Sequence, residues 1–154
     1  MTDKEKAIVN QFFVRVFNQI LSWEEESFKE MGVSEITLRE LHVIEAVYSL
    51  IEKGENQMSE IAKYLSITPG SLTTAVNCLV KKGYLVRESQ PGDRRVVKIV
   101  PTKAAEEVNK IHQKLHKDMI DGVLENIEDE DMPAVLKTLD GLNKFFSKKE
   151  SSRR

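Results

Sequence analysis

Hydrophobic residues recur at every third or fourth position near both ends of the chain, which is the period of an amphipathic α-helix. This pattern predicts helices over residues 4–31 and 102–126 and around 135–146, with a frayed polar tail from residue 147. The apolar stripe of the first predicted helix comprises Ile8, Phe12, Phe13, Val16, Phe17, Ile20 and Leu21. Because so small a monomer would leave these stripes exposed, the pattern favours a homodimer.

Between the terminal helices, the sequence predicts a helix-turn-helix. Thr37 can cap a helix that ends near Gly54, and a shorter helix is expected over residues 59–65. After a tight turn, Thr68 suits the N-cap of a further helix, with Pro69 at its first position. Two helices joined in this way are typical of proteins that place the second helix in the major groove of DNA.

The helix that follows Thr68 has an outward face of small polar residues. Its hydrophobic positions, which a helical wheel turns inward, are Leu72, Ala75, Val76 and Leu79. Threonine and asparagine can hydrogen-bond base edges and allow close approach to a groove. We therefore predict DNA contacts from Gly70, Ser71, Thr73, Thr74, Asn77 and Lys81. The alternative is an ordinary surface helix with no ligand.

A basic β-hairpin is predicted after this helix. Gly83 ends the helix, residues 84–87 form a strand, residues 90–93 a turn and residues 94–100 a returning strand. Arg94 and Arg95 then lie at the tip of the hairpin, where guanidinium groups can enter the minor groove of DNA. The alternative is an exposed hairpin in which these arginines pair with Asp93 at the surface.

Charge is distributed unevenly along the chain. The formal net charge is -2, but residues 63–103 carry eight basic and two acidic residues, which makes this segment basic and the remainder acidic. A basic segment in an acidic protein is expected where phosphates bind, although a solvated charged surface is the simpler alternative. The chain begins without an apolar signal sequence and contains one cysteine, so we expect a soluble cytoplasmic protein without a membrane segment.

The sequence resembles the MarR family of bacterial transcription regulators over nearly its whole length. The resemblance rests on the segment 79–85, the Asp93-x-Arg95 pattern inside residues 90–95, and residues 97–102, in which Pro101 takes the place of a common leucine. It implies a mainly α-helical fold with a small β-hairpin wing, in which the wing Arg95 enters the minor groove and Asp93 orients it.

The resemblance also implies how the chain is organised. Residues 1–154 would form a single MarR-like domain, with a winged helix-turn-helix lobe at 36–101 and dimerisation helices at 4–31 and 102–147. A dimer of such lobes is expected to bind a palindromic operator whose half-sites lie about 10 base pairs apart. The expected function is that of a sequence-specific transcription regulator, a repressor whose DNA affinity is released or tuned by a small ligand.

The sequence leaves the ligand open between two chemical classes. No metal or cofactor is required, but His42, His112 and His116 form a candidate zinc-binding set with a carboxylate such as Glu24, because an i, i+4 spacing places two imidazoles on one helix face. A zinc-sensing branch of the family uses ligands from comparable helices. A helix-face pair and one buried histidine would explain the same pattern. We prefer a small lipophilic or acyl ligand, since residues 41–44 and 115–119 look similar to the branch that represses fatty-acid synthesis genes.

Two other classes of protein fit the sequence less well than a DNA-binding regulator does. The chain lacks a glycine-rich phosphate loop, a nucleophile elbow and a His-Glu-x-x-His pattern, so we expect no enzymatic activity. A protein–protein adaptor on a winged-helix scaffold remains the alternative. An adaptor has no need for the wing arginines together with the Thr73, Thr74 and Asn77 face, so their combination favours DNA binding.

Overall fold

The computed structural model describes residues 2–33, 35–90 and 92–151, and the side chains at 90, 93–95 and 149–151 lie outside that description. The elements follow one another as α1 (Asp3–Glu30), α2 (Leu38–Ile51), α3 (Met58–Tyr64), α4 (Pro69–Lys81), β1 (Leu85–Gln90), β2 (Asp93–Pro101), α5 (Lys103–Leu124) and α6 (Met132–Ser151). The predicted fold class, mainly α with one antiparallel β-hairpin, is confirmed.

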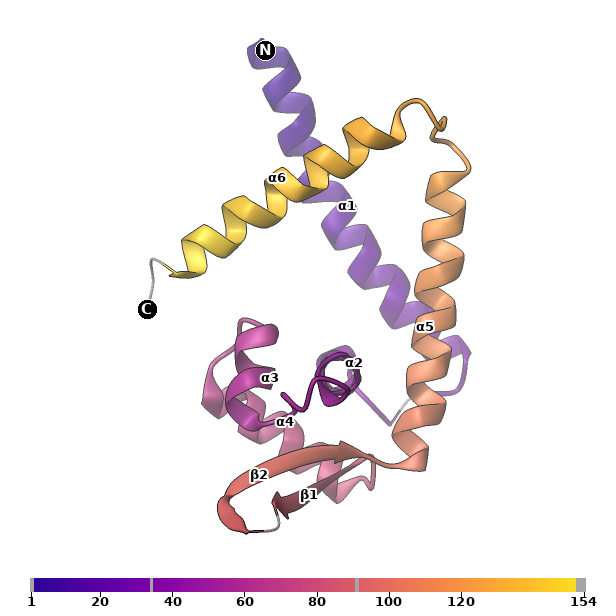
Figure 1. Cartoon of the computed structure of the whole chain (residues 1–154). Helices are drawn as coiled ribbons and strands as arrows, with labels where there is room; N and C mark the ends of the chain where they lie inside the picture. Colours follow the sequence, from indigo (N-terminus) through magenta and orange to yellow (C-terminus); the bar gives the residue numbers. More distant parts are fainter. Residues whose placement is uncertain (1, 34, 91, 152–154) are drawn as a thin grey trace.

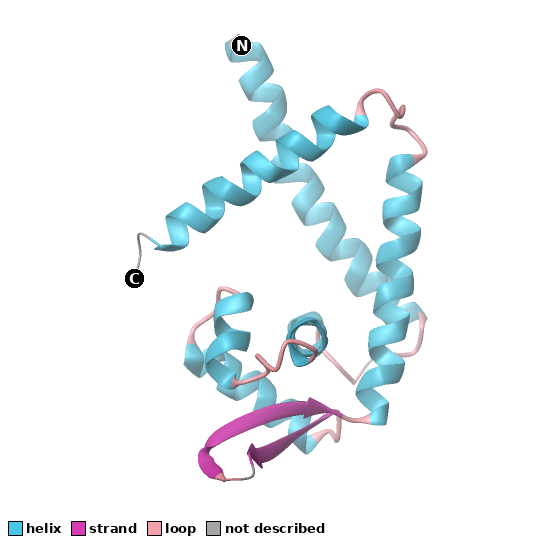
Figure 2. Ribbon diagram, viewed as in Figure 1, coloured by secondary structure: helices cyan, strands magenta, loops and turns pink. Residues whose placement is uncertain are grey.

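The elements divide into a small lobe and a set of long terminal helices. Helices α2, α3 and α4 gather beside the β-hairpin, and we call residues 36–101 the winged lobe (Figure 1). Helix α5 leaves the hairpin and leads to α6 at the opposite end of the molecule, while α1 extends away from the lobe. The hairpin therefore forms one extremity of the molecule (Figure 2).

The hydrophobic core lies mainly within the winged lobe. Leu72, Val76 and Leu79 of α4 are fully buried and Ala75 nearly so, as the helical wheel predicted. They pack with the buried side chains of α2, α3 and the hairpin, which include Val43, Ile44, Val47, Ile61, Leu85 and Ile99. Since burial of one such side chain stabilises a fold by roughly 1.5–3 kcal/mol, this packing fixes α4 with its polar face outward.

Local capping sets the limits of α4. The Thr68 side chain accepts a hydrogen bond from the backbone of Ser71, and Pro69 is the first helical residue. At the other end Gly83 has φ +81°, and Tyr84 N donates to Leu79 O at 2.9 Å while Gly83 N donates to Val80 O at 3.1 Å. This is the Schellman arrangement, in which a glycine adopts the left-handed conformation that other residues avoid.

The hairpin is longer than the sequence predicted. Strand β1 extends to Gln90 and β2 runs from Asp93 to Pro101, with a register irregularity between Ser89 and Gln90. Cross-strand pairing extends both strands beyond the residues whose side chains favour β structure on their own. Pro91, within the predicted turn, lies outside the described residues.

The C-terminal end was predicted wrongly. Helix α6 continues to Ser151, whereas a frayed tail was expected from Ser147. No glycine or proline interrupts residues 142–151, so the helical hydrogen bonds can continue through a polar segment. None of the described helices has an apolar stretch long enough to cross a bilayer.

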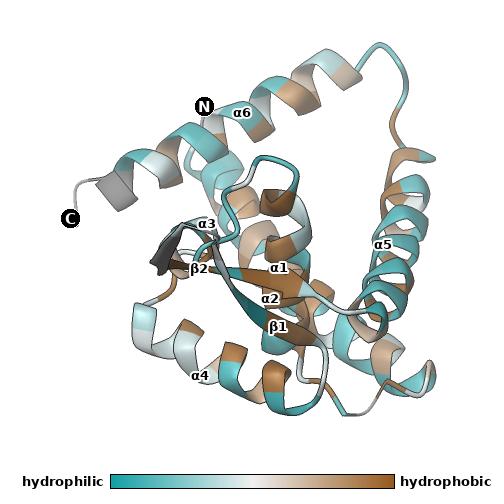
Figure 3. Cartoon of the chain, turned by 60° about the horizontal axis from the view of Figure 1, so that its bottom comes forward, coloured by the Kyte–Doolittle hydropathy of each residue, from teal (hydrophilic) through white to brown (hydrophobic). Residues whose placement is uncertain are grey.

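Large hydrophobic side chains are exposed along the terminal helices. Hydrophobic and hydrophilic positions alternate along α6, as they do along α4 (Figure 3). On α6, however, Leu136, Leu139, Phe145 and Phe146 are each more than half exposed. The same holds on α1 for Ile8, Phe12, Val14 and Phe17.

Candidate nucleic-acid interface

The outward face of α4 is the first part of the candidate interface. Gly70, Thr73, Thr74, Asn77 and Lys81 are exposed, and Ser71 is half-buried. Apart from the backbone of α4 itself, no described heavy atom lies within 4 Å of the position that a Cβ would take at Gly70, so the start of the helix offers open space for an approaching backbone. The six residues selected from the sequence thus belong to one face or edge of one helix.

The threonine hydroxyls on this face have fixed orientations. Thr73 Oγ1 donates to Pro69 O at 2.8 Å, and Thr74 Oγ1 donates to Gly70 O at 3.1 Å. Because each hydroxyl proton is used inside the helix, the oxygens remain available as acceptors and the methyl groups as apolar contacts. Both are groups that base edges in the major groove can recognise.

Arg87 of β1 joins this face and was not among the predicted site residues. Arg87 Nη2 donates to Asn77 Oδ1 at 2.7 Å, so the strand after α4 folds back beside it. The contact occupies the amide oxygen of Asn77 and leaves its amide NH₂ as the free recognition group. The sequence shows Arg87 only as a basic residue on a predicted strand, and its pairing with Asn77 depends on how Gly83 reverses the chain.

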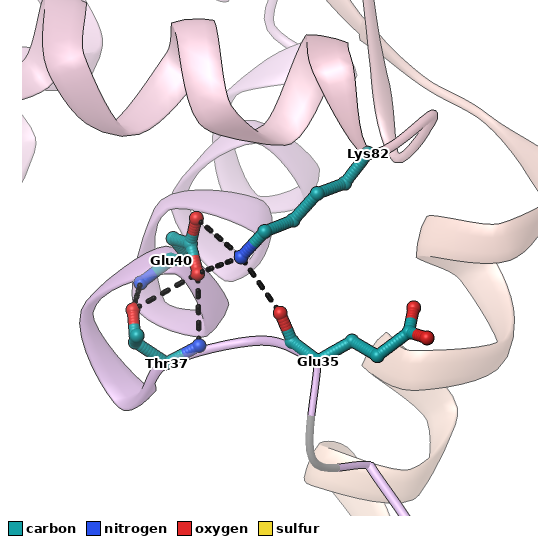
Figure 4. A network of polar contacts seen from close by, with 4 residues as sticks. All are labelled: Glu35, Thr37, Glu40 and Lys82. Atoms are coloured by element: carbon teal, nitrogen blue, oxygen red, sulfur yellow. Dashed lines mark hydrogen bonds and ion pairs between the residues drawn. The ribbon is translucent and has the colours of Figure 1, made fainter.

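A partly buried ion pair holds the C-terminal end of α4 against α2. Lys82 Nζ donates to both carboxylate oxygens of Glu40, at 2.8 and 2.9 Å, and to Glu35 O at 2.7 Å (Figure 4). Glu40 also accepts a hydrogen bond from Thr37 N at 2.8 Å, which completes the capping box of α2. The same carboxylate thus caps one helix and anchors the other.

The Glu40 carboxylate is stabilised in its ionised form. Burial by itself would raise the pKa of Glu40, but the hydrogen bonds from Lys82 and Thr37 outweigh that effect and lower the pKa from its usual value. Only the capping role of Thr37 was visible in the sequence. The partner Lys82 is distant in the chain and looked like an ordinary basic residue at a helix end.

The base of the wing is attached to the lobe by Asn56. Its buried side-chain amide donates to Ile99 O at 2.8 Å, and Ile99 N donates to Asn56 O at 2.8 Å. Gln57 also forms an isolated antiparallel β-bridge with Lys98, so the segment before α3 lies against β2. The backbone of the predicted wing residues Asp93, Arg94 and Arg95 lies in β2, and their side chains lie outside the described part of the structure.

Residues 36–97 match the family model of the MarR family. The match runs from the start of the winged lobe into β2. Over this segment the chain is similar to proteins of the MarR family. Among curated relatives, YcgE of Bacillus subtilis is 27% identical over 130 residues, which are 84% of this chain and 80% of YcgE. YhbI of the same organism is 28% identical over 113 residues, 70% of each chain. Both are described as uncharacterized HTH-type transcriptional regulators.

Solved structures of MarR proteins share the whole architecture. Streptococcus pneumoniae FabT, crystallised in complex with DNA, superposes with a TM-score of 0.84 and 28% identity, over 93% of this chain and 98% of FabT. The Staphylococcus aureus MepR–DNA complex gives a TM-score of 0.74 over 90% of this chain and 97% of MepR. At 15% identity, MepR supports the fold alone.

The three histidines singled out in the sequence converge outside the α4 face. His42 of α2 and His112 and His116 of α5 all lie beside Glu24, a buried residue of α1. Glu24, His42 and His112 each offer a ligand atom, and these atoms lie within 4.8 Å of one another.

Proposed function

We propose that this protein is a MarR-family transcription regulator that binds a specific double-stranded DNA sequence as a homodimer. In each protomer α4 would enter the major groove, with Gly70, Ser71, Thr73, Thr74, Asn77 and Lys81 at or near the bases and phosphates. The hairpin would place Arg94 and Arg95 at the minor groove, with Asp93 orienting Arg95. The observation that carries this proposal is the small polar face of α4, held rigidly beside a basic hairpin.

Dimerisation is supported by the terminal helices. Exposed side chains such as Phe12 and Phe17 on α1 and Leu139 and Phe146 on α6 form apolar surfaces that a second copy of the chain can cover. A two-fold dimer presents two α4 helices, so the operator is expected to be palindromic, with half-sites about 10 base pairs apart. Bacterial relatives such as YcgE support a role in the bacterial cytoplasm.

We further propose that this regulator acts as a repressor tuned by a small lipophilic or acyl ligand. A groove of about 300 Å³ lies between α1, α2 and the turn after α3, and its lining is Leu21, Leu38, Arg39, His42, Val43, Leu65 and Ile67. Its apolar walls suit an aliphatic chain, and Arg39 suits an anionic group. A ligand bound there would act by favouring a lobe orientation that fits the operator poorly.

Selection of bound sequences from random duplex DNA tests the DNA-binding proposal. We expect enrichment of one palindromic sequence. Arg95→Ala should then lower affinity for it by roughly 1–3 kcal/mol while the dimer mass stays unchanged. Lys114→Ala, which removes a positive charge from an exposed position on α5, is the control and should bind nearly as the wild type does. Recovery of no preferred sequence would contradict the proposal and favour the adaptor function.

A further inference from the structure

Glu24 lies at the centre of a cluster of imidazoles from two other helices. Its Oε2 is 3.7 Å from His42 Nε2, and its Oε1 is 3.5 Å from His112 Nε2 and 2.5 Å from His116 Nε2. The rings of His112 and His116 are 4.2 Å apart, edge to face. Four nitrogen and oxygen ligands on a tetrahedral Zn²⁺ lie roughly 3.3 Å from one another, as bond lengths of about 2.0–2.1 Å require. The cluster is therefore close to the dimensions of a metal site.

The Glu24 carboxylate is buried without a permanent cation beside it. Its side chain is 3% exposed, and within the described part of the chain its ion-pair partners are the three histidines, with no lysine or arginine. A buried carboxylate in such surroundings is costly unless a positive charge compensates it. A divalent cation held between Glu24 and the imidazoles would supply that charge and would be coordinated by the carboxylate and the imidazole nitrogens together.

One ring nitrogen of His112, Nε2, faces the Glu24 carboxylate. The His112 side chain is 1% exposed, and among the described residues its Nε2 is buried without a hydrogen-bond partner. Nδ1 of the same ring lies 3.8 Å from Glu45 Oε2. A histidine that binds a metal through one ring nitrogen commonly has a carboxylate beside its other ring nitrogen.

We propose that Glu24, His42, His112 and His116 form a binding site for a divalent transition-metal ion, with Zn²⁺ as the best fit. Three imidazole nitrogens and one carboxylate oxygen suit a borderline ion, whereas Mg²⁺ and Ca²⁺ prefer oxygen ligands throughout. The ligands come from α1, α2 and α5, so the ion joins the winged lobe to the terminal helices. The site does not depend on the DNA-binding proposal, because none of its residues belongs to the α4 face or the wing.

Metal binding by the purified full-length chain tests this proposal directly. After treatment with chelator, the protein is titrated with Zn²⁺ in competition with a chromogenic chelator, and with Co²⁺ to record its visible spectrum. We expect one ion per chain and the intense absorption of tetrahedral Co²⁺. The measurements use a Cys78→Ser background, because Cys78 is an exposed thiol that could bind metal by itself.

Variants separate the proposed ligands from their neighbours. Glu24→Gln, His42→Gln and His116→Gln should each weaken Zn²⁺ binding by more than the roughly 10–100-fold expected for Glu45→Gln, which changes an outer partner only. Glu25→Gln alters the adjacent, exposed carboxylate of α1 and should leave affinity unchanged. His42 and His116 are 34% and 36% exposed, so their variants are expected to fold, which circular dichroism checks.

The thermal midpoint gives a second, independent result. Zn²⁺ should raise the Tm of the wild type and of Glu25→Gln, because a ligand that binds the native state stabilises it, and should leave the Tm of His42→Gln unchanged. Absence of stoichiometric binding, or an affinity that the Glu24, His42 and His116 variants do not lower, would overturn the metal site. DNA binding by chelator-treated protein would in that case still support the proposed function.

Discussion

Glu40 makes the position of α4 depend on a single charged side chain. Its carboxylate accepts hydrogen bonds from Lys82 and from the N-cap residue Thr37, and it is buried beneath the end of the helix. Hydrogen bonds to a charged group contribute more to stability than neutral ones do. The free energy of unfolding should therefore be sensitive both to this residue and to its ionisation.

Glu40→Gln should lower the free energy of unfolding by roughly 1.5–3 kcal/mol near pH 7. The pKa of Glu40 is lowered in the folded protein, so its contribution is fully present above the unfolded pKa of about 4.3 and is lost as the pH falls through the folded pKa. Urea unfolding at several pH values should show the wild type and variant converging in acid. Glu52→Gln, an exposed carboxylate after the same helix, is the control, and an equally large effect there would contradict this role for Glu40.

Asn77 and Arg87 are expected to act in DNA binding as a unit. Both side chains are exposed, so their 2.7 Å hydrogen bond should contribute little to stability. Arg87→Ala frees the Asn77 amide to rotate and should weaken operator binding by about 1 kcal/mol or more through that loss of orientation. In a double-mutant cycle with Asn77→Ala, the two losses in binding free energy should add to more than the loss of the double variant. Full additivity would show that the two residues act separately.

The sequence predicted those site residues whose role depends on residues close to them along the chain. The exposed face of α4 follows from helical periodicity, and the caps Thr37, Thr68 and Thr102 follow from the chemistry of helix starts. Arg87 and Asn56 were missed because their partners come from elements brought together only by tertiary packing. The same is true of the Glu40–Lys82 pair.

At the scale of elements, α4 was predicted most accurately because both of its ends are encoded locally. Thr68 with Pro69 begins the helix, and Gly83 ends it. The hairpin and α6 were predicted less well. Strand length depends on the partner strand, and a polar helix end gives no apolar period by which to recognise its last turns.

Gly83→Ala should destabilise the protein by about 1–2 kcal/mol, because alanine at φ +81° pays the steric cost of a left-handed conformation. A steric clash with the rest of the fold is not the cause, since beyond the adjacent residues no described heavy atom lies within 4 Å of a Cβ at this position. Gly70→Ala in the same helix is the matched variant. It should raise stability by up to about 1 kcal/mol but weaken operator binding, because its methyl group would face the groove. Thermal unfolding and DNA titration of both variants check these opposite effects, and equal changes in stability would refute the argument.

At the scale of the whole molecule, the terminal helices are predicted to form the dimer interface. Phe17 on α1 is 64% exposed in the single chain, and Leu139 on α6 is 55% exposed. Phe17→Glu and Leu139→Glu each place a charge at one of these apolar positions. Burying that charge against a second copy is unfavourable, so analytical ultracentrifugation should show dissociation toward monomer. Tyr64→Glu, equally exposed but on α3 of the winged lobe, should leave the dimer intact. An undiminished dimer in both helix variants would remove these faces from the interface.

Charge separation within the molecule agrees with this division of roles. The basic segment 63–103 contains α4 and the hairpin, whereas the acidic remainder includes the terminal helices. The net charge of -2 therefore conceals a basic segment that suits phosphate binding. The sequence predicted this distribution and the fold class, but it could not show that Glu24 and three histidines from separate helices meet in one place.

The central claim is specific binding of duplex DNA by a dimer, and fluorescence anisotropy with the selected palindrome and a scrambled duplex tests it most directly. We predict binding of two chains per palindrome, at least about a thousandfold tighter than to the scrambled duplex near physiological salt. Affinity for both duplexes should fall steeply as salt rises, since phosphate contacts release counterions. Equal affinity for the two duplexes at every salt concentration would contradict the account.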